Sequence, residues 1–207
     1  MNKKHIGIIA VISILIVCTA SIGYIAYSGV WRDWIAGERE SSYIYWVQIS
    51  STRELYNVTL YIPFPMKDGE VTSLANEMTN KFSEKNWTAE IIDTEHGKML
   101  KISHSTPPRG VSITIDEEAK HVVNTKKPVG NEPVLYPRFN DTGTEYKSYI
   151  YTDYNTSLDN KLNVNIRMSG VNYRGEFGVS EYYKDQVRCT LDGEIHTWHI
   201  VNGTLGT

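Results

Sequence analysis

LNVNIRM, residues 162–168, alternates apolar and polar side chains without interruption. Successive side chains of a β-strand point to opposite faces of a sheet, so the apolar members would bury one face and leave the other in water. The same alternation returns at 57–62 and 111–116, and it predicts strands there. Less regular runs predict further strands at 42–49, 87–93, 99–104, 145–153, 182–191 and 194–201.

Short turns connect these runs and set their direction. Glu95-His96-Gly97 and Asp192-Gly193 each lie between two predicted strands, and glycine supplies the positive φ that a tight hairpin needs. Hairpins pair consecutive strands in opposite directions. We therefore expect a mainly β fold, an antiparallel β-sandwich.

One segment has a helical period instead. Its apolar residues are spaced three or four apart, it follows a candidate N-cap at Asp68, and we expect one amphipathic helix there. The proline-containing stretch 117–139 reads as loop with at most one short edge strand. This stretch is compatible with a single sandwich and also with two subdomains divided near 117–139. The helical spacing is formed by Val71, Leu74, Ala75, Met78 and Phe82.

The N-terminus contains the longest apolar run of the chain. From Ile6 to Tyr27 there are 22 residues without a charge, enough for a helix of about 33 Å to cross a hydrocarbon core of about 30 Å. Lys3 and Lys4 precede the run, and such a basic end stays in the cytoplasm. We expect residues 1–5 inside, a transmembrane anchor at 6–30, a linker at 31–40, and an exported domain at 41–207.

Three other forms of export are less consistent with this run. A cleaved signal peptide would end at small residues, but Thr19-Ala20-Ser21 lies within the apolar run. A lipid-modified Cys18 would follow the branched Val17, where a small residue is expected. A pilin-like leader would need an acidic residue inside the run. The uncleaved anchor in the cell membrane is the interpretation that we favour.

Charge and cysteine content restrict the exported part. Lys3 and Lys4 are the only charged residues among the first 30, which leaves 19 Lys and Arg against 24 Asp and Glu. This mildly acidic domain offers no basic surface for nucleic acid. Cys189 is its only cysteine, so no disulfide can form within it, and a buried thiol is expected.

Five Asn-x-Ser/Thr sequons follow the apolar run. Such a sequence is an acceptor for N-glycosylation in an exported chain, where it belongs on the surface. We therefore expect a glycoprotein with glycosylation sites at Asn57, Asn86, Asn140, Asn155 and Asn202.

VTLYIPFP at 58–65 and TEHGKMLKI at 94–102 resemble patterns in uncharacterised archaeal surface proteins. Those proteins have an N-terminal membrane anchor and a β-rich ectodomain. The resemblance covers about a quarter of the chain and implies location and fold. It carries no active site.

Candidate metal ligands compete with ordinary structural roles. His196 and His199 are three apart, which in a strand places them on opposite faces and disfavours chelation. Adding Cys189, with His96 or His104 upstream, gives a copper-like set of ligands, although a hairpin turn separates the cysteine from the histidines. Oxygen-rich segments that calcium could use are Asp141–Glu145 and Asp153–Asp159, while Asp116-Glu117-Glu118 reads as a solvated strand end.

No local signature of an enzyme is found in the sequence. Gly-x-Ser-x-Gly, Ser-x-x-Lys, Cys-x-x-Cys, His-Glu-x-x-His and phosphate-binding glycine loops are missing, so no catalytic residue and no cofactor are predicted. The 14 tyrosines suit a sheet and also a recognition face. We expect a non-enzymatic surface binding or accessory module with a protein or glycan partner. The alternative is an exported domain that binds calcium or copper.

Overall fold

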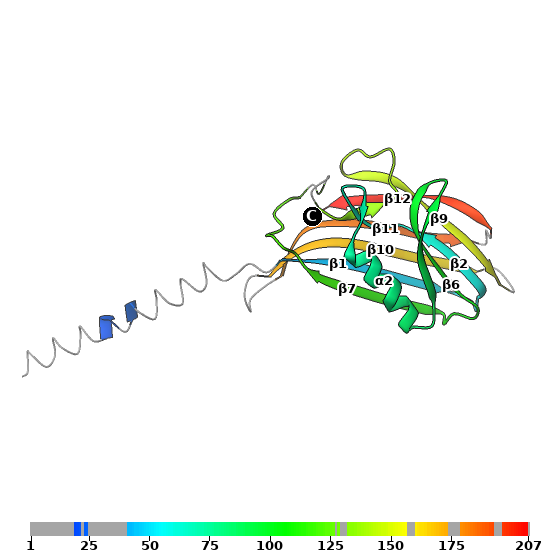
Figure 1. Cartoon of the computed structure of the whole chain (residues 1–207), viewed down its shortest axis with the longest axis horizontal. Coiled ribbons are helices and arrows are strands. Elements are labelled where there is room, and N and C mark those ends of the chain that lie inside the picture. The colour runs from blue at the N-terminus through cyan, green and yellow to red at the C-terminus, as the bar shows by residue number, and fades with distance from the viewer. Residues whose placement is uncertain are drawn as a thin grey trace, which may run out of the picture. The chain divides into compact units, whose positions relative to one another are not determined.

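The computed structural model describes residues 19–21, 23–24, 41–126, 128, 132–156, 160–173, 179–192 and 196–206 (Figure 1). The expected anchor and linker therefore lie outside the described residues, except for helical positions at 19–21 and 23–24. No helix within the described ranges has the length and apolar character needed to cross a bilayer. Contacts divide the chain into two units, and residues 40–173 with 179–207 form the unit that contains the sheets.

This unit is mainly β, and every pair of neighbouring strands is antiparallel. Nine strands form one large sheet in the order β5-β6-β2-β9-β12-β11-β10-β1-β7. Their bounds in that order are Thr88–Thr94, Gly97–His104, Tyr56–Ile62, Glu145–Asn155, Thr197–Gly206, Val179–Asp192, Lys161–Tyr173, Ser41–Ser51 and Gly110–Glu118.

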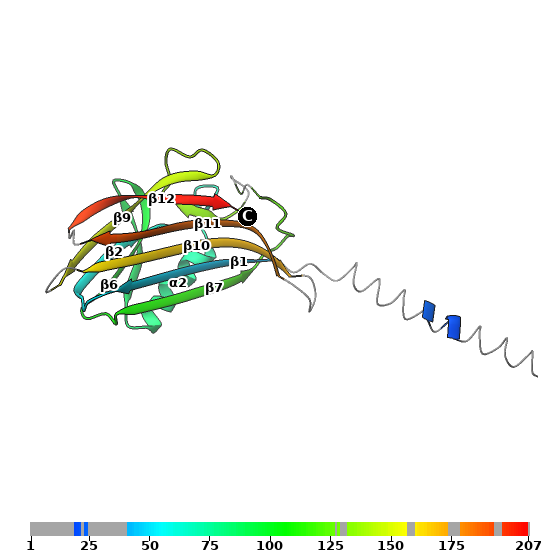
Figure 2. The same cartoon turned by 180° about the vertical axis from the view of Figure 1, so that it is seen from behind.

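A second layer covers the face of this sheet that carries the apolar core. It contains a three-stranded sheet in the order β4-β3-β8, with bounds Glu70–Val71, Phe64–Lys67 and Val134–Tyr136. It also contains the helix α2, Ser73–Glu84, which lies in front of the large sheet in Figure 1 and behind it in Figure 2. Instead of two sheets of similar size, as a β-sandwich would suggest, one large curled sheet is covered by a small sheet and a helix.

Alternation in the sequence matches the observed burial. In β10, Leu162, Val164, Ile166 and Met168 are fully buried. The turn between the strands at 88–94 and 97–104 and one helix also form in the predicted regions. At the second predicted turn, Asp192 is the last residue of β11, and residues 193–195 lie outside the described ranges. Within 117–139 the described residues contain the last two residues of β7 and the short strand β8, which lies at the edge of the small sheet.

The helix begins later than the sequence suggested. Thr72 is its N-cap, and the Thr72 side chain accepts a hydrogen bond from the Ala75 amide. Asp68, the expected cap, lies instead in the turn between β3 and β4 with φ 52°. Asp68-Gly69 therefore closes a hairpin that sequence periodicity did not reveal, because β3 and β4 are too short to show alternation.

The helix determines how far the large sheet must curl. Eight steps of about 4.8 Å would place β5 and β7 about 38 Å apart in a flat sheet. Yet α2, whose 12 residues extend about 18 Å, lies against both of these edge strands. The sheet therefore curls until one helix spans the distance between its edges.

Two glycines allow tyrosine rings to pack inside this curve. Gly170 of β10 faces Tyr183 across the strand pair, and Gly203 of β12 faces Tyr146. A Cβ atom added to either glycine would overlap the ring of its partner. Each ring thus lies flat on a neighbouring backbone, and Gly170 also marks an irregularity in register.

We predict that Gly203→Ala lowers the free energy of unfolding by about 2–3 kcal/mol, because the new methyl group must displace the buried Tyr146 ring. Urea denaturation measures this change. Gly206→Ala in the same strand is the matched control, since no atom lies within 4 Å of the place that its new methyl group would take. Equal stability of the two variants would contradict the packing argument.

Candidate functional site

Aromatic side chains form a row on the outer face of the large sheet, the face opposite the core. Tyr61 of β2 pairs with Tyr151 of β9, and Tyr151 pairs with Trp198 of β12. Lys101 of β6 and Glu90 of β5 continue the same line across two more strands. We call Tyr61, Tyr151 and Trp198 the aromatic row.

The rings of the row pack on one another. Tyr61 and Tyr151 are stacked with centroids 4.8 Å apart, and Trp198 lies 5.1 Å from Tyr151 and 5.7 Å from Tyr61. Such offset and edge contacts stabilise aromatic pairs beyond simple burial. The rings are therefore held in fixed positions before any partner arrives.

Tyr149 connects two loops to this row. His96, from the turn between β5 and β6, stacks on Tyr149 at 3.7 Å and 7°, and Phe139 stacks on Tyr149 at 4.7 Å. His96 also meets Trp198 edge to face at 4.6 Å. The β5–β6 turn and the segment that contains Phe139 thus join one cluster with rings of β9 and β12.

All six rings are partly exposed. No described residue hydrogen-bonds to the hydroxyl groups of Tyr61, Tyr149 or Tyr151. Partial burial, with the nearby Asp153 carboxylate, raises the pKa of Tyr151. The cluster thus combines fixed apolar surface with phenol groups that can still bond a partner.

Charged pairs and one apolar residue border the row. Lys101 Nζ lies 2.7 Å from Glu90 Oε1, and His196 Nδ1 lies 2.8 Å from Asp153 Oδ1. Ile200, two positions after Trp198 on the same face, is 60% exposed. The surface therefore has an apolar centre and a mixed polar rim.

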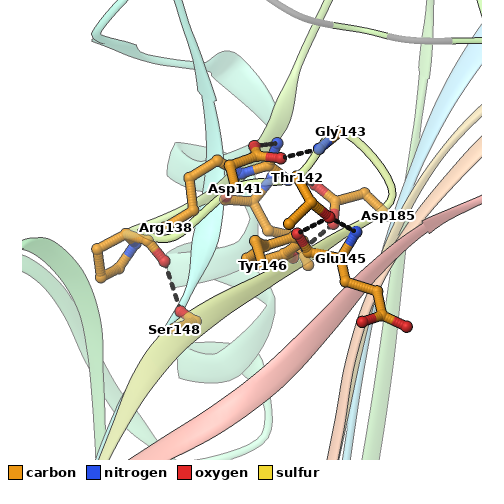
Figure 3. Close-up of polar contacts among 10 residues, drawn as sticks. Arg138, Asp141, Thr142, Gly143, Glu145, Tyr146, Ser148 and Asp185 are labelled. Atoms are coloured by element: carbon orange, nitrogen blue, oxygen red, sulfur yellow. Dashed lines mark hydrogen bonds and ion pairs between the residues drawn. The ribbon is translucent and has the colours of Figure 1, made fainter.

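Inside the curl, an ion pair fixes the segment that follows β8 (Figure 3). Asp185 of β11 is fully buried and accepts hydrogen bonds from Arg138 Nη2 at 2.7 Å, Leu135 N at 2.7 Å and Tyr146 Oη at 2.5 Å. The Arg138 guanidinium also lies 4.0 Å over the Tyr146 ring. A buried charge needs such partners to be tolerated.

Burial raises the pKa of Asp185 to about 6, although the Arg138 charge and the hydrogen bonds from Tyr146 and Leu135 oppose the shift. A carboxyl whose pKa is higher in the folded than in the unfolded chain holds its proton longer when folded. Its contribution to the free energy of unfolding is therefore greatest below about pH 4 and is lost as the pH rises through 6.

A second buried carboxyl lies beside a cavity of about 420 Å³. Glu132, 3% exposed, accepts a hydrogen bond from the Tyr43 hydroxyl and lies 2.9 Å from His121 Nε2. Burial and the bond to Glu132 raise the pKa of Tyr43. Across the cavity the Ser73 hydroxyl, at the start of α2, donates to Glu117 at 2.7 Å, so a carboxylate already lies at this helix N-terminus.

The structure does not assemble the candidate copper ligands. Cys189 packs against the core, and burial raises its thiol pKa to about 12. His196 pairs with Asp153, while His199 Nε2 lies 2.8 Å from the Thr152 hydroxyl. Among the described residues, no three His, Cys, Asp or Glu side chains are arranged to hold a metal ion.

The other two histidines of the candidate copper set each have partners of their own. His96 belongs to the aromatic cluster, whereas His104 Nδ1 accepts a hydrogen bond from the Thr106 amide and its ring meets Trp87.

The candidate calcium segments have internal partners. Asp141 Oδ1 accepts a hydrogen bond from the Gly143 amide, and its Oδ2 lies 3.1 Å from Arg138 Nη1. Thr142 and Glu145 bond to each other, which makes Asp141–Glu145 a closed turn. In the second segment, residues 157–159 lie outside the described ranges.

All five sequon asparagines are exposed. Asn57, Asn86 and Asn140 have positive φ angles between 50° and 64°, a conformation that asparagine tolerates in turns. Asn155 ends β9, and Asn202 lies within β12. Glycosylation stays a prediction, and every acceptor side chain is accessible to it.

Sequence reasoning missed the Asp185 and Glu132 sites because their partners are distant along the chain. Arg138 and Asp185 are 47 residues apart, and Tyr43 and Glu132 are 89 apart. One signal was present: Asp185 alternates with Tyr183 and Val187, which places a charge at an inward position of a strand. Such a position calls for a buried partner.

No family model matches the chain, and no curated protein or solved structure is significantly similar to it.

We predict that Arg138→Met lowers the free energy of unfolding by about 3 kcal/mol at pH 7.5, because it leaves the buried Asp185 carboxylate without its cation. The loss should be smaller at pH 5, where Asp185 is already neutral in the folded protein. Urea unfolding at both pH values measures the difference. The control is Arg109→Met, which breaks a surface pair with Glu54 and should change the free energy of unfolding little at either pH. If Arg138→Met costs the same at both pH values, the charge argument is wrong.

Proposed function

We propose that this chain is a single-pass membrane protein whose β domain lies outside the cell and binds a protein partner through the aromatic row. The observation that supports the binding role is the packed, partly exposed cluster on the outer face of β2, β9 and β12. The uncharged run from Ile6 to Tyr27, with Lys3 and Lys4 before it, supports the anchor and its orientation.

Side-chain chemistry favours a protein as the partner. Tyr and Trp provide large contact area while losing little conformational freedom, and they are enriched where binding energy is concentrated. Here stacking has already fixed Tyr61 and Tyr151, so binding would order them little further.

The rim adds orientation to this surface. Lys101 with Glu90 lies beyond Tyr61, and Asp153 with His196 borders Tyr151 and Trp198. Exposed ion pairs contribute little to stability and can exchange partners at an interface. A protein with its own polar rim can therefore align on the row. The separated cysteine and histidines offer no comparable support for the metal-binding alternative.

The contact surface can be tested by photo-crosslinking in intact cells that produce the full chain. A photoreactive phenylalanine analogue replaces Tyr61, and the matched control position is Arg188, an exposed residue on the outer face of β11. We predict a discrete protein adduct from position 61 that is absent from position 188. Trp198→Ala should reduce that adduct by about tenfold, the equivalent of about 1.4 kcal/mol of binding energy.

Two outcomes would contradict this role for the row. Identical adducts from positions 61 and 188 would mean that the row is not selective. An adduct that contains carbohydrate and no protein would show that the partner is a glycan.

The orientation predicts which end of the chain antibodies can reach. An epitope tag after Thr207 should be stained on intact cells, whereas a tag before Met1 should be stained only after permeabilisation, because the basic N-terminus is retained inside. Flow cytometry measures both. The reverse pattern would contradict the proposed location without bearing on the aromatic row.

A further inference from the structure

The five sequons differ in the residue two positions before the asparagine. That residue is apolar and exposed only at Asn202, where it is Ile200 at 60% exposure. Before Asn57 it is the buried Leu55, at 5% exposure. The remaining three are the charged Glu84, Arg138 and Asp153.

Strand geometry places Ile200 and Asn202 side by side. Both lie on the outer face of β12, and residues two apart in an antiparallel strand are separated by about 6.8 Å. Ile200 is opposite Tyr149, and Asn202 is opposite Lys147, an exposed residue of β9. The side-chain amide of Asn202 therefore reaches solvent directly beside the exposed Ile200 side chain. Asn202 is two positions farther from Trp198 than Ile200 is.

A pyranose ring has complementary chemistry. Its axial C–H groups form an apolar face, while its hydroxyl groups point outward around the ring and stay hydrated. A sugar held on Asn202 can turn its C–H face to Ile200 without desolvating its hydroxyls. This contact removes apolar area of Ile200 from water, which favours the folded state.

We propose that Asn202 carries an N-linked glycan whose first sugar packs on Ile200. The inference rests on the extracytoplasmic location proposed above. The glycan comes from a lipid-phosphate-linked oligosaccharide. Asn202 Nδ2 bonds to C1 of the sugar and releases one proton to solvent, while the C1–oxygen bond to the lipid phosphate breaks and its electron pair leaves on that oxygen.

The other sequons lack this arrangement. Asn57, Asn86 and Asn140 are at positions of positive φ, where the chain turns. Asn86 follows the C-terminal end of α2, and Lys85 and Glu84 next to it are exposed. A glycan there has no exposed apolar neighbour two residues earlier. Asn155, which ends β9 and is not among the positions of positive φ, follows the charged Asp153 by two residues and is the matched control.

The test uses the full chain from a host with an N-glycosylating secretory pathway, purified in detergent. Mass spectrometry of proteolytic peptides measures occupancy at each sequon. Thermal unfolding then compares Asn202→Gln with Asn155→Gln, both alone and combined with Ile200→Ser. We expect Asn202→Gln to lower Tm by about 2–4 °C, and Asn155→Gln to leave it unchanged.

A double-mutant cycle separates packing from a general effect of the glycan. Asn202→Gln should no longer change Tm when Ile200 is already serine, because the apolar contact is gone. An equal loss in both backgrounds would overturn the packing, and an empty Asn202 beside an occupied Asn155 would overturn the modification. If every sequon is empty, the inference fails together with the proposed location, which the epitope staining checks separately.

Discussion

Attachment of residues 132–138 to the concave side of the large sheet is the constraint on which the fold depends. The Tyr183 hydroxyl donates to the Pro133 carbonyl, the Leu135 amide donates to Asp185, and the Ser148 hydroxyl donates to the Pro137 carbonyl. β8 has only three residues and pairs with a single strand, so its own ladder could not hold this segment in place. Polar groups inside the sheet therefore position the second layer, and Gly170 and Gly203 provide the space for two of the tyrosines involved.

Local sequence predicted the elements of the fold better than their arrangement. Alternation in 162–168 and helical spacing in 71–82 are properties of neighbours in sequence, and both appear where expected. The order of the sheet depends on pairing between distant segments: β2 lies between β6 and β9, and its register with β9 shifts between Tyr56 and Thr59. No periodicity contains that information, which is why an antiparallel β-sandwich was expected in place of one large curled sheet.

The aromatic cluster shows the same division between local and distant information. The number of tyrosines suggested a recognition face, and Tyr149 and Tyr151 fall on one face of β9 from alternation alone. Their association with Tyr61, Trp198, Phe139 and His96 required the cross-strand register and two loop positions. Likewise, the sequence reveals that Ile200 precedes Asn202 by two, but only the structure shows that Ile200 is exposed while Leu55 before Asn57 is buried.

The position of α2 also bears on edge-to-edge aggregation between copies of this protein. Edge strands of a sheet carry unpaired amide and carbonyl groups that can add a strand from another molecule, a common route to edge-to-edge aggregation. Here both edge strands of the large sheet, β5 and β7, contact the same helix, so a strand that approaches either edge does so next to α2. The helix would matter most where copies are held close together, because crowding raises the chance that two sheets meet edge to edge.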